Sequence, residues 1–434
     1  MSKYPSDWPS KPLGKVYPKI VVGYVGNVND HYCRAEEGVP FYRTLNIRDG
    51  YFRHSEHLYV THEFNEKNKK SQITNNDILI ARVGANLGMV CKANGISSLA
   101  NMANAIIIKT NDVNSADADF YTSFLLSPMG KNQIYSGAAG GAQGVFNTKL
   151  TQEIIVPVPP LPEQRKIAKI LSTWDRGIAT TEKLIDASKQ QKKALMQQLL
   201  TGKKRLVDPE TGMAFEGEWR KSKTPYESLP SDWSELALEK LSSFITKGAT
   251  PTTYGFEWQE YGIPFLRSEC VGKNGFKESG LNYICDAAHE AMARSKVYAG
   301  DILITITGNV GRVCRLPNKY PQANINQHIA KVTLKDENVC SDFIFHCLQD
   351  NKYQSNFERI TTGQAYPQIS LVQVRNTIVP LPPISEQQKI ASVLIAADKE
   401  IELLEAKLAH LKQEKKALMQ QLLTGKRRVQ VEAA

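Results

Sequence analysis

Residues 192–205 read KKALMQQLLTGKKR, and residues 415–428 read KKALMQQLLTGKRR. The two stretches differ only at Lys204, which is matched by Arg427. At the same offset, residues 156–168 (VPVPPLPEQRKIA) match residues 379–391 (VPLPPISEQQKIA). A repeat whose period is about half the chain indicates a duplicated pair of domains, because a solenoid would repeat every 20–50 residues or so.

Each repeated segment has the pattern of one long helix. The proline-rich stretch before it cannot continue a helix backwards, and Gly202 and Gly425 suit a C-terminal cap. Apolar residues recur at alternating steps of four and three, which is typical of a coiled-coil seam. The seam positions are Ile167, Leu171, Trp174, Ile178, Thr181, Ile185, Ser188, Lys192, Leu195 and Leu199 in the first copy, and Ile390, Leu394, Ala397, Ile401, Leu404, Leu408, Leu411, Lys415, Leu418 and Leu422 in the second.

We expect the two helices, each of about forty residues and roughly 60 Å, to pair with each other as an antiparallel coiled coil. The seams share length and register, and the whole domain that connects the helices leaves room for opposite directions. Two alternatives stay open: each helix could pack on its own domain, or the seam could dimerise the chain.

The segments before the helices align more loosely. PSDW occurs at 5–8 and 230–233, GVPFYR at 38–43 matches GIPFLR at 262–267, and DILI occurs at 77–80 and 301–304. Short apolar runs closed by Gly and Asn predict strands, and 118–126 and 341–348 look like short helices. The fold class is therefore α+β, with two globular domains in tandem, each followed by a long helix. The expected boundaries are 1–157, 158–205, 206–380 (including a linker), 381–428 and a tail at 429–434.

Composition sets broad limits. A chain of 434 residues suggests about two to four domains. The net charge of +10 and the pI near 9.0 permit a polyanionic partner without proving one. No apolar run reaches the eighteen or so residues of a membrane helix, and the N-terminal residues have no signal-peptide pattern. The seven scattered cysteines are expected to be reduced thiols of a cytoplasmic protein.

Recognisable catalytic motifs are missing from the sequence. No two glycines are separated by one residue, no Gly-Lys precedes Ser or Thr, and no Asn-Pro occurs. Dinucleotide loops, Walker A loops and the amino-methyltransferase signature are thus excluded. His54, His57 and His62 have no counterpart in the second half and are loosely spaced, so we interpret them as surface or strand residues and expect no metal. Asp77 and Asp301 precede strands without a Glu-x-Lys partner, which favours turn residues over nuclease carboxylates.

Two divergent domains, each followed by a nearly identical helix, resemble the specificity subunit of a type I restriction–modification enzyme. PLPEQRKIA at 160–168 and LMQQLLTG at 195–202 carry the resemblance most specifically. It covers the whole chain and implies that 1–157 and 206–380 hold target recognition domains for double-stranded DNA, with the helices as spacer. It further implies a non-catalytic subunit of a host-defence system. Its partners would be two modification (methyltransferase) and two restriction (translocase/nuclease) subunits, and these would carry S-adenosylmethionine, ATP and Mg²⁺.

Two different readers on such a spacer would recognise a bipartite, asymmetric DNA sequence with a non-specific gap. The helix length would set the gap at less than two duplex turns of about 34–36 Å each. Two other functions stay open, namely a standalone methyltransferase or nuclease and a coiled-coil scaffold that does not bind DNA.

Residues that would read DNA are chosen by chemistry and by position in matching loops. Asn and Gln suit adenine, Arg and Lys suit guanine, and small polar or basic groups hold phosphates. The candidates are Arg43, Arg82, Asn86, Asn104 and Gln143 in the first half, and Lys247, Thr250, Arg267, Asn309, Gln327, His328, Gln364 and Tyr366 in the second. The basic helix ends, 192–193 with 203–205 and 415–416 with 426–428, could contact phosphates or a modification subunit, or simply be solvated.

Overall fold

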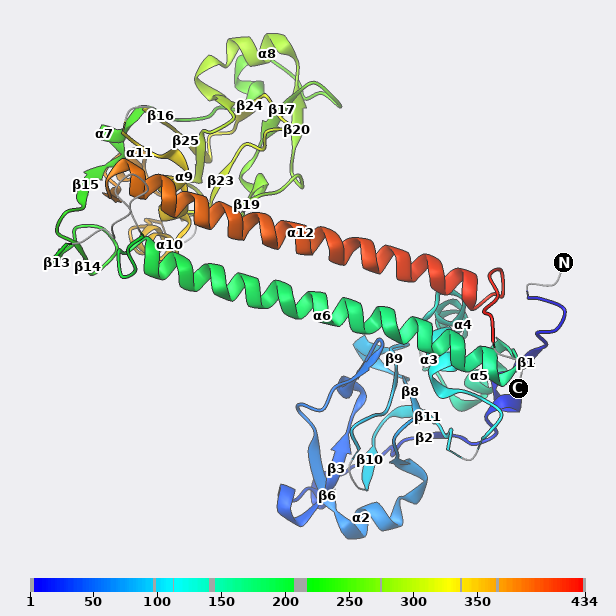
Figure 1. Ribbon diagram of the computed structural model, residues 1–434. Coiled ribbons are helices and arrows are strands. Elements are labelled where there is room, and N and C mark those ends of the chain that lie inside the picture. Colours follow the sequence, from blue (N-terminus) through cyan, green and yellow to red (C-terminus); the bar gives the residue numbers. More distant parts are fainter. Residues whose placement is uncertain are drawn as a thin grey trace. The chain divides into compact units, whose positions relative to one another are not determined.

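The computed structural model describes residues 4–96, 99–111, 113–139, 145–206, 217–273, 275–335, 338–363 and 367–431 (Figure 1). The chain divides into two compact units. Unit 1 comprises Met1–Lys183 and Ala406–Ala434, and unit 2 comprises Leu184–Glu405. Each unit therefore contains one globular part together with a portion of both long helices. The domain boundaries drawn from the sequence stay a prediction.

The long helices are α6 (Leu161–Leu199) and α12 (Ile384–Leu422), with 39 residues each. All twenty predicted seam positions are buried or half-buried. Gly202 and Gly425 follow the helices with φ of 73° and 69°, the left-handed conformation of a C-terminal cap. The predicted caps are thus confirmed, whereas pairing of the helices as one coiled coil stays a prediction.

Unit 1 opens with short elements and ends its globular part before α6. Its helices are α1 (Leu13–Val16), α2 (His62–Lys67), α3 (Ala118–Leu126), α4 (Pro128–Ala139) and α5 (Thr148–Glu153). Its strands are β1 (Ser10–Pro12), β2 (Ile20–Val22), β3 (Gly38–Tyr42), β4 (Ile47–Arg48), β5 (Tyr51–Phe52), β6 (Leu58–Thr61), β7 (Gln72–Ile73), β8 (Ile78–Ala81), β9 (Val90–Lys92), β10 (Ala100–Met102), β11 (Ala105–Ile108) and β12 (Ile155–Pro157).

Unit 2 has its globular part between α6 and α12. Its shorter helices are α7 (Leu238–Leu241), α8 (Asp286–Ala291), α9 (Ser341–Gln349), α10 (Asn351–Arg359) and α11 (Leu371–Arg375). Its strands are β13 (Trp219–Lys221), β14 (Ser228–Pro230), β15 (Ser234–Ala237), β16 (Ser242–Lys247), β17 (Ile263–Leu266), β18 (Val271–Gly272), β19 (Gly275–Phe276), β20 (Asn282–Ile284), β21 (Lys296–Tyr298), β22 (Ile302–Thr305), β23 (Val313–Arg315), β24 (Gln322–Ile325), β25 (Ile329–Leu334) and β26 (Ile378–Leu381).

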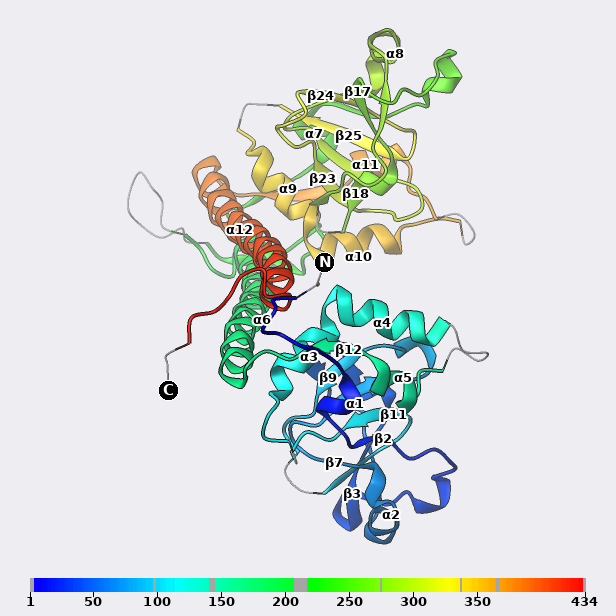
Figure 2. The same ribbon diagram turned by 90° about the vertical axis from the view of Figure 1, so that its right-hand side faces the viewer.

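The two units share one sheet topology. An antiparallel four-stranded sheet has the order β2-β11-β8-β9 in unit 1 and β16-β25-β22-β23 in unit 2. A second four-stranded sheet has the order β6-β3-β10-β7 or β20-β17-β24-β21, with β3-β10 and β17-β24 as parallel pairs. In unit 1, α3, α4 and α5 lie toward one end, and β3 with α2 lies toward the other (Figure 2). The prediction of two similar domains of mixed helix and strand is confirmed.

The central strands are apolar on both faces because both faces are covered. In β8, Ile78 and Ile80 pack in a core that also contains Phe120 of α3 and Ile167 of α6. The alternating residue Leu79 packs in a different core, on the opposite face of the strand. The continuous run ILIA follows from this double burial, as it does for strands enclosed on both sides. Each fully buried Ile contributes about 1.5–3 kcal/mol of hydrophobic stabilisation.

The aspartates that precede these strands act as turn residues, as predicted. Asp77 accepts a hydrogen bond from the backbone N–H of Thr74 at 2.9 Å and pairs with Lys109 Nζ at 2.7 Å. Asp301 accepts one from the backbone N–H of Tyr298 at 2.9 Å. Among the described residues, no group of three or more His, Cys, Asp or Glu side chains could hold a metal ion, and no helix is long and apolar enough to cross a membrane.

Candidate nucleic-acid interface

A pocket in unit 2 lies at the carboxyl ends of the parallel strands β17 and β24. Phe265 is in register with Asn324 and Leu266 with Ile325, so the two strands end level with each other. The pocket has a volume of about 330 Å³. Its lining residues are Thr250, Trp258, Phe265, Arg267, Ser268, Glu269, Asn326, Gln327 and His328. Four residues chosen from the sequence, Thr250, Arg267, Gln327 and His328, thus meet around one pocket, the strand-end pocket.

Hydrogen bonds connect Thr250, Gln327 and His328 to one another and Arg267 to a neighbouring loop. Thr250 Oγ1 donates to Gln327 Oε1 at 2.6 Å, and Gln327 Nε2 lies 3.2 Å from His328 Nε2. Arg267 Nε donates to the carbonyl oxygen of Gly280 at 3.0 Å, so this arginine also braces the loop before β20. The exposed Gln327 is therefore held in place by its neighbours although it faces solvent.

The corresponding strand ends of unit 1 carry Arg43 and Asn104. Here Asn101 is in register with Phe41, and Met102 with Tyr42. Arg43 Nη2 donates to the carbonyl oxygen of Glu56 at 3.2 Å, the counterpart of the brace made by Arg267. Asn104 follows β10 with a φ of 51°, a left-handed conformation that Asn tolerates better than most residues.

A buried polar group fixes the second strand of each parallel pair. In unit 2, Asn324 Nδ2 donates to Ser295 Oγ at 2.7 Å. In unit 1, Ser71 Oγ donates to Asn101 Oδ1 at 2.6 Å. Asn324 and Asn101 are both fully buried, so their amides need these partners. The strand ends are therefore rigid supports for the polar residues that follow them.

The other candidates lie elsewhere. Asn86 uses its amide internally, because its Oδ1 accepts from Arg48 Nη1 at 2.9 Å and its Nδ2 donates to the carbonyl oxygen of Thr44 at 3.2 Å. Arg82 is half-buried directly after β8, and Lys247 is exposed at the end of β16. Gln143, Gln364 and Tyr366 lie outside the described residues.

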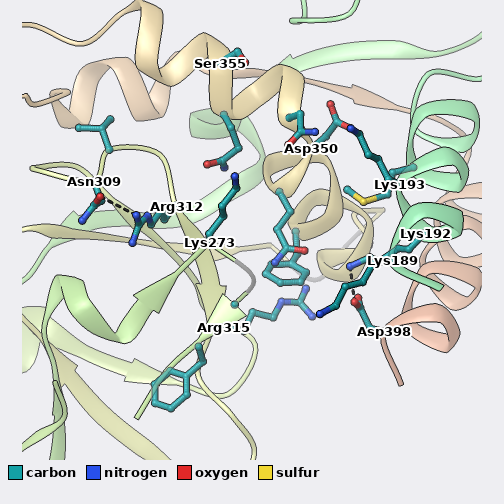
Figure 3. Close-up of a pocket in the computed structure, with 18 of the residues that line it drawn as sticks. Lys189, Lys192, Lys193, Lys273, Asn309, Arg312, Arg315, Asp350, Ser355 and Asp398 are labelled. Atoms are coloured by element: carbon teal, nitrogen blue, oxygen red, sulfur yellow. Dashed lines mark hydrogen bonds and ion pairs between the residues drawn. The ribbon is translucent and has the colours of Figure 1, made fainter. Parts of the chain in front are cut away.

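A larger cleft of about 1520 Å³ in unit 2 contains the candidate Asn309. Asn309 Oδ1 accepts a hydrogen bond from Arg312 Nη2 at 2.8 Å. Figure 3 shows these two residues across the cleft from Lys192 and Lys193 of α6. Its basic lining residues are Lys189, Lys192, Lys193, Lys273, Arg312 and Arg315. Lys189 and Lys192 are paired with acidic residues of α12, Glu405 at 2.6 Å and Asp398 at 2.5 Å.

Trp258, Glu269, Asn326, Lys273 and Arg312 line these two cavities but were not selected from the sequence. Two of them carried a usable signal. Trp258 stands in an aromatic-rich loop, YGFEWQEYG at 254–262, and Asn326 directly precedes Gln327 and His328. Lys273 and Arg312 carried no such signal, because they approach α6 only in the folded unit.

The nearly identical sequence segments meet at a second kind of site. In unit 2, Arg205 follows α6 and binds Glu386 in the first turn of α12, with Nε at 2.7 Å and Nη2 at 2.8 Å from the carboxylate oxygens. The same guanidinium donates to Asp232 at 2.8 and 3.1 Å and lies 5.5 Å from the ring centre of Trp233. Burial raises the pKa of Glu386. Burial opposes a charged Arg205, but Asp232 and Glu386 outweigh it and raise the pKa of Arg205.

Unit 1 repeats this arrangement with Arg428. Arg428 binds Glu163 in the first turn of α6, with Nε at 2.9 Å from Oε2, and donates to Asp7 at 2.8 and 2.9 Å. Its guanidinium lies 5.4 Å from the ring centre of Trp8. The hydrogen bond from Arg428 lowers the pKa of Asp7. We call these two sites the Arg–Trp joints, one per unit.

Other repeated residues also belong to the joints. A Cβ atom on Gly202 would lie 2.4 Å from Pro230 Cγ, and one on Gly425 would lie 2.5 Å from Pro5 Cγ. The glutamine after each joint glutamate ties the helix start to the preceding loop. Gln164 Nε2 donates to the carbonyl oxygen of Pro159, and Gln387 Nε2 to that of Pro382, both at 2.8 Å. The repeated Glu-Gln, Thr-Gly and PSDW motifs thus have one structural explanation.

Known proteins match the chain along most of its length. A family model described as "Type I restriction modification DNA specificity domain" matches residues 5–189 and 230–413. The protein of Methanocaldococcus jannaschii assigned as the MjaX type I restriction enzyme specificity subunit is 28% identical over 436 residues, which cover 99% of this chain and 96% of that protein. The type I restriction enzyme MjaVIII specificity subunit of the same organism is 25% identical over 397 residues, covering 90% and 86%.

Two solved structures share the fold. The S subunit of a type I restriction–modification system from M. genitalium has a TM-score of 0.59 at 14% identity and covers 96% of each chain. A chain from a study of complex assembly in a type I R-M system has a TM-score of 0.56 at 17% identity, covering 98% of this chain and all of that one. The family model matches twice, beginning at Pro5 and at Pro230, so the internal repeat coincides with the family's own domain.

Proposed function

The chain belongs to the family of type I restriction–modification DNA specificity domains, and we propose that it selects the DNA target of such an enzyme. Each unit reads one half of a bipartite, asymmetric sequence. The chain itself performs no catalysis. Modification and restriction subunits, two of each, supply the chemistry and bind S-adenosylmethionine, ATP and Mg²⁺.

The observation that carries this proposal is the pair of matching strand ends with different side chains. Both units hold polar residues rigidly at the carboxyl ends of a parallel strand pair. Unit 1 has Arg43 and Asn104 there, whereas unit 2 has Arg267, Gln327 and His328. Amide and guanidinium groups recognise base edges in the major groove. One scaffold with two side-chain sets is what reading two different half-sites requires.

Ion pairs between α6 and α12 support a role of the two long helices as a spacer. In unit 1, Asp175 of α6 pairs with Lys415 of α12, and Glu182 pairs with Lys412 at 2.8 Å. In unit 2, Lys189 pairs with Glu405 and Lys192 with Asp398. In both units, residues further along α6 pair with residues that come earlier in α12. The contacts within each unit therefore support an antiparallel arrangement. We infer that both sets belong to one coiled coil whose length sets the gap between half-sites.

Docking of the modification subunits would use the repeated helix ends. Their buried positions, such as Leu199 and Leu422, are explained by packing in the cores. Packing does not explain identity at exposed positions. The exposed residues identical in both copies are Lys193, Ala194, Gln197, Gln198 and Lys203, with Lys416, Ala417, Gln420, Gln421 and Lys426. A partner that binds twice would need the same surface twice, related by a pseudo-twofold axis.

Domain exchange tests the proposal directly. We expect that replacing residues 1–157 by the same domain of another family member, in the assembled methyltransferase, will change one half of the methylated sequence only. The matched control replaces residues 206–380 and should change the other half. Sequencing of methylated sites measures both. A change in both halves, or in neither, would contradict modular reading, and DNA methylation or cleavage by the chain alone would contradict a non-catalytic subunit.

A further inference from the structure

We propose that Gln327, oriented by Thr250 and His328, reads one adenine in the half-site of unit 2. This inference rests on the proposed function and specifies a base for one residue of the strand-end pocket. Gln327 would touch the base directly. Thr250 would be a positioning residue that acts through the amide of Gln327.

The location of Gln327 suits base contact. It stands between β24 and β25, in a connection one residue longer than its counterpart in unit 1. Residues 326–328 separate the strands here, against 103–104 between β10 and β11. Gln327 is exposed, but the residue before it, Asn326, is buried, and β24 is fixed by the buried Asn324. The amide therefore projects from a rigid base.

The donor and acceptor positions left on the Gln327 amide match those of adenine. A glutamine amide has two acceptor positions on Oε1 and two donor hydrogens on Nε2. The hydroxyl of Thr250 occupies one acceptor position at 2.6 Å. His328 Nε2 lies 3.2 Å from the amide nitrogen and accepts one hydrogen in the tautomer that carries its proton on Nδ1. One acceptor and one donor are then left for a ligand.

Adenine is the base whose major-groove edge matches one free acceptor and one free donor of the amide. Its N6 amino group donates and its N7 accepts, so it can bind both positions at once. Guanine presents two acceptors there, cytosine presents a donor, and thymine presents an acceptor beside a methyl group. Each of these bases would leave one position of the amide unmatched.

Thr250 and His328 together decide which way the amide faces. The Thr250 hydroxyl donates to Oε1, and His328 Nε2 accepts from the amide nitrogen in the tautomer that carries its proton on Nδ1, so the oxygen lies on the Thr250 side and the nitrogen on the His328 side. Thr250 directly precedes the short helical turn Pro251–Tyr254, which holds it half-buried. Without the hydroxyl, the amide could rotate by half a turn and exchange its donor and acceptor. Discrimination for adenine would then be lost although Gln327 is still present.

Unit 1 lacks this arrangement. Gly23 and Gly248 occupy matching places, because a Cβ on either would collide with the carbonyl oxygen of the matching β-strand residue, Met102 or Ile325. Two residues later, unit 1 has the exposed Val25 where unit 2 has Thr250. Valine has no hydroxyl, so the orienting bond is specific to unit 2.

The test uses the full chain assembled with its modification subunit and a DNA library with randomised half-sites. Methylated molecules are sequenced for the wild type, Gln327→Ala, Thr250→Val and Thr250→Ser. We expect Gln327→Ala and Thr250→Val to weaken preference for one A·T pair by roughly 5- to 150-fold, the value of one bidentate base contact. Thr250→Ser keeps the hydroxyl and should retain the wild-type preference. Thr252→Val, at an exposed neighbouring threonine, is the matched control.

The outcomes separate this inference from the proposed function. The half-site of unit 2 is identified independently, as the one that changes when residues 206–380 are exchanged. Unchanged preference in Gln327→Ala, relaxation in the other half-site, or a half-site without a fixed A·T pair would overturn the adenine assignment while bipartite reading stands. Loss of preference in Thr250→Ser as well as Thr250→Val would overturn the positioning role. A wild type without any bipartite preference would refute both proposals.

Discussion

The Arg–Trp joint of unit 2 is repeated in unit 1, whereas the strand-end pocket of unit 2 differs from the corresponding place in unit 1. The joint is reproduced group by group, with an arginine bound to two carboxylates and lying over a tryptophan. The pocket keeps its strands and its bracing arginine, but Thr250 is matched by Val25 and the connection differs in length. A duplicated chain has thus kept the contacts that hold helices to domains and varied the residues at the strand ends.

The largest expected effect comes from breaking the joints. Arg205→Ala leaves the fully buried Glu386 without its positively charged partner, so we expect unit 2 to lose about 3–5 kcal/mol of unfolding free energy. Arg428→Ala should cost less, because the Arg428 side chain is 41% exposed against 11% for Arg205. Urea unfolding measures both, with Lys204→Ala as the exposed control. A larger loss for Arg428→Ala would mean that the two joints are not ranked by burial.

Acid should distinguish the units through His346. Burial, assisted by the positive charges of Lys192 and Arg315, lowers the pKa of His346 to about 3. In the unfolded chain His346 binds a proton near pH 6.5, whereas in the folded unit it stays neutral down to about pH 3. Unit 2 therefore loses stability as the pH falls from 6.5 toward 3. The loss is about 2 kcal/mol by pH 5. The contribution of the group to the pH dependence falls off above pH 6.5 and is gone by about pH 8.

The matching residue of unit 1 is Ser123, the sixth of α3 as His346 is the sixth of α9. His346→Ser should flatten the acid slope of unit 2, measured by urea unfolding at a series of pH values. The slope is the readout, since the substitution also changes packing. An unchanged slope would show that another group causes the acid sensitivity.

Two glycines of α6 and its cap should respond in opposite directions to alanine. Gly202→Ala places a Cβ against Pro230 at a positive φ, and we expect a loss of about 1–3 kcal/mol. Gly177→Ala lies within the helix, where no neighbour other than the helix's own nearby backbone lies within 4 Å of the added Cβ, and should gain about 0.5–1 kcal/mol. Thermal unfolding compares the two. Equal changes in thermal stability for Gly202→Ala and Gly177→Ala would show that the joint does not require glycine at position 202.

The smallest effect is expected in the basic cleft of unit 2. If Lys273 and Arg312 contact phosphates, replacing either by alanine should weaken DNA binding of the assembled complex only few-fold. It should also reduce the salt slope of binding by about one. Binding titrations at several salt concentrations measure this, with Lys240→Ala as control. An unchanged slope would exclude the cleft from DNA contact.

Sequence periodicity predicted the helices and their ends because a seam and a cap are local patterns. The strands at Ile78 and Ile302 were predicted for the same reason. The partners of Arg205 and Arg428 could not be predicted, since each arginine follows one helix and binds the first turn of the other. Nor could the sequence tell that the amide of Asn86 bonds to Arg48 and Thr44, whereas the amide of Gln327 bonds to Thr250 and His328 at the strand-end pocket. That distinction depends on hydrogen bonds between loops far apart in the chain.

The joint of unit 1 has a consequence for synthesis on the ribosome. Its members Asp7, Trp8 and Glu163 emerge early, but Arg428 comes more than 260 residues after Glu163. The core of unit 1 also includes Leu422 and Leu423. Unit 2 is formed by one continuous stretch, Leu184–Glu405, and can close as soon as that stretch has emerged. The unit whose globular part is translated first is therefore completed last, and until then part of its apolar core has no cover.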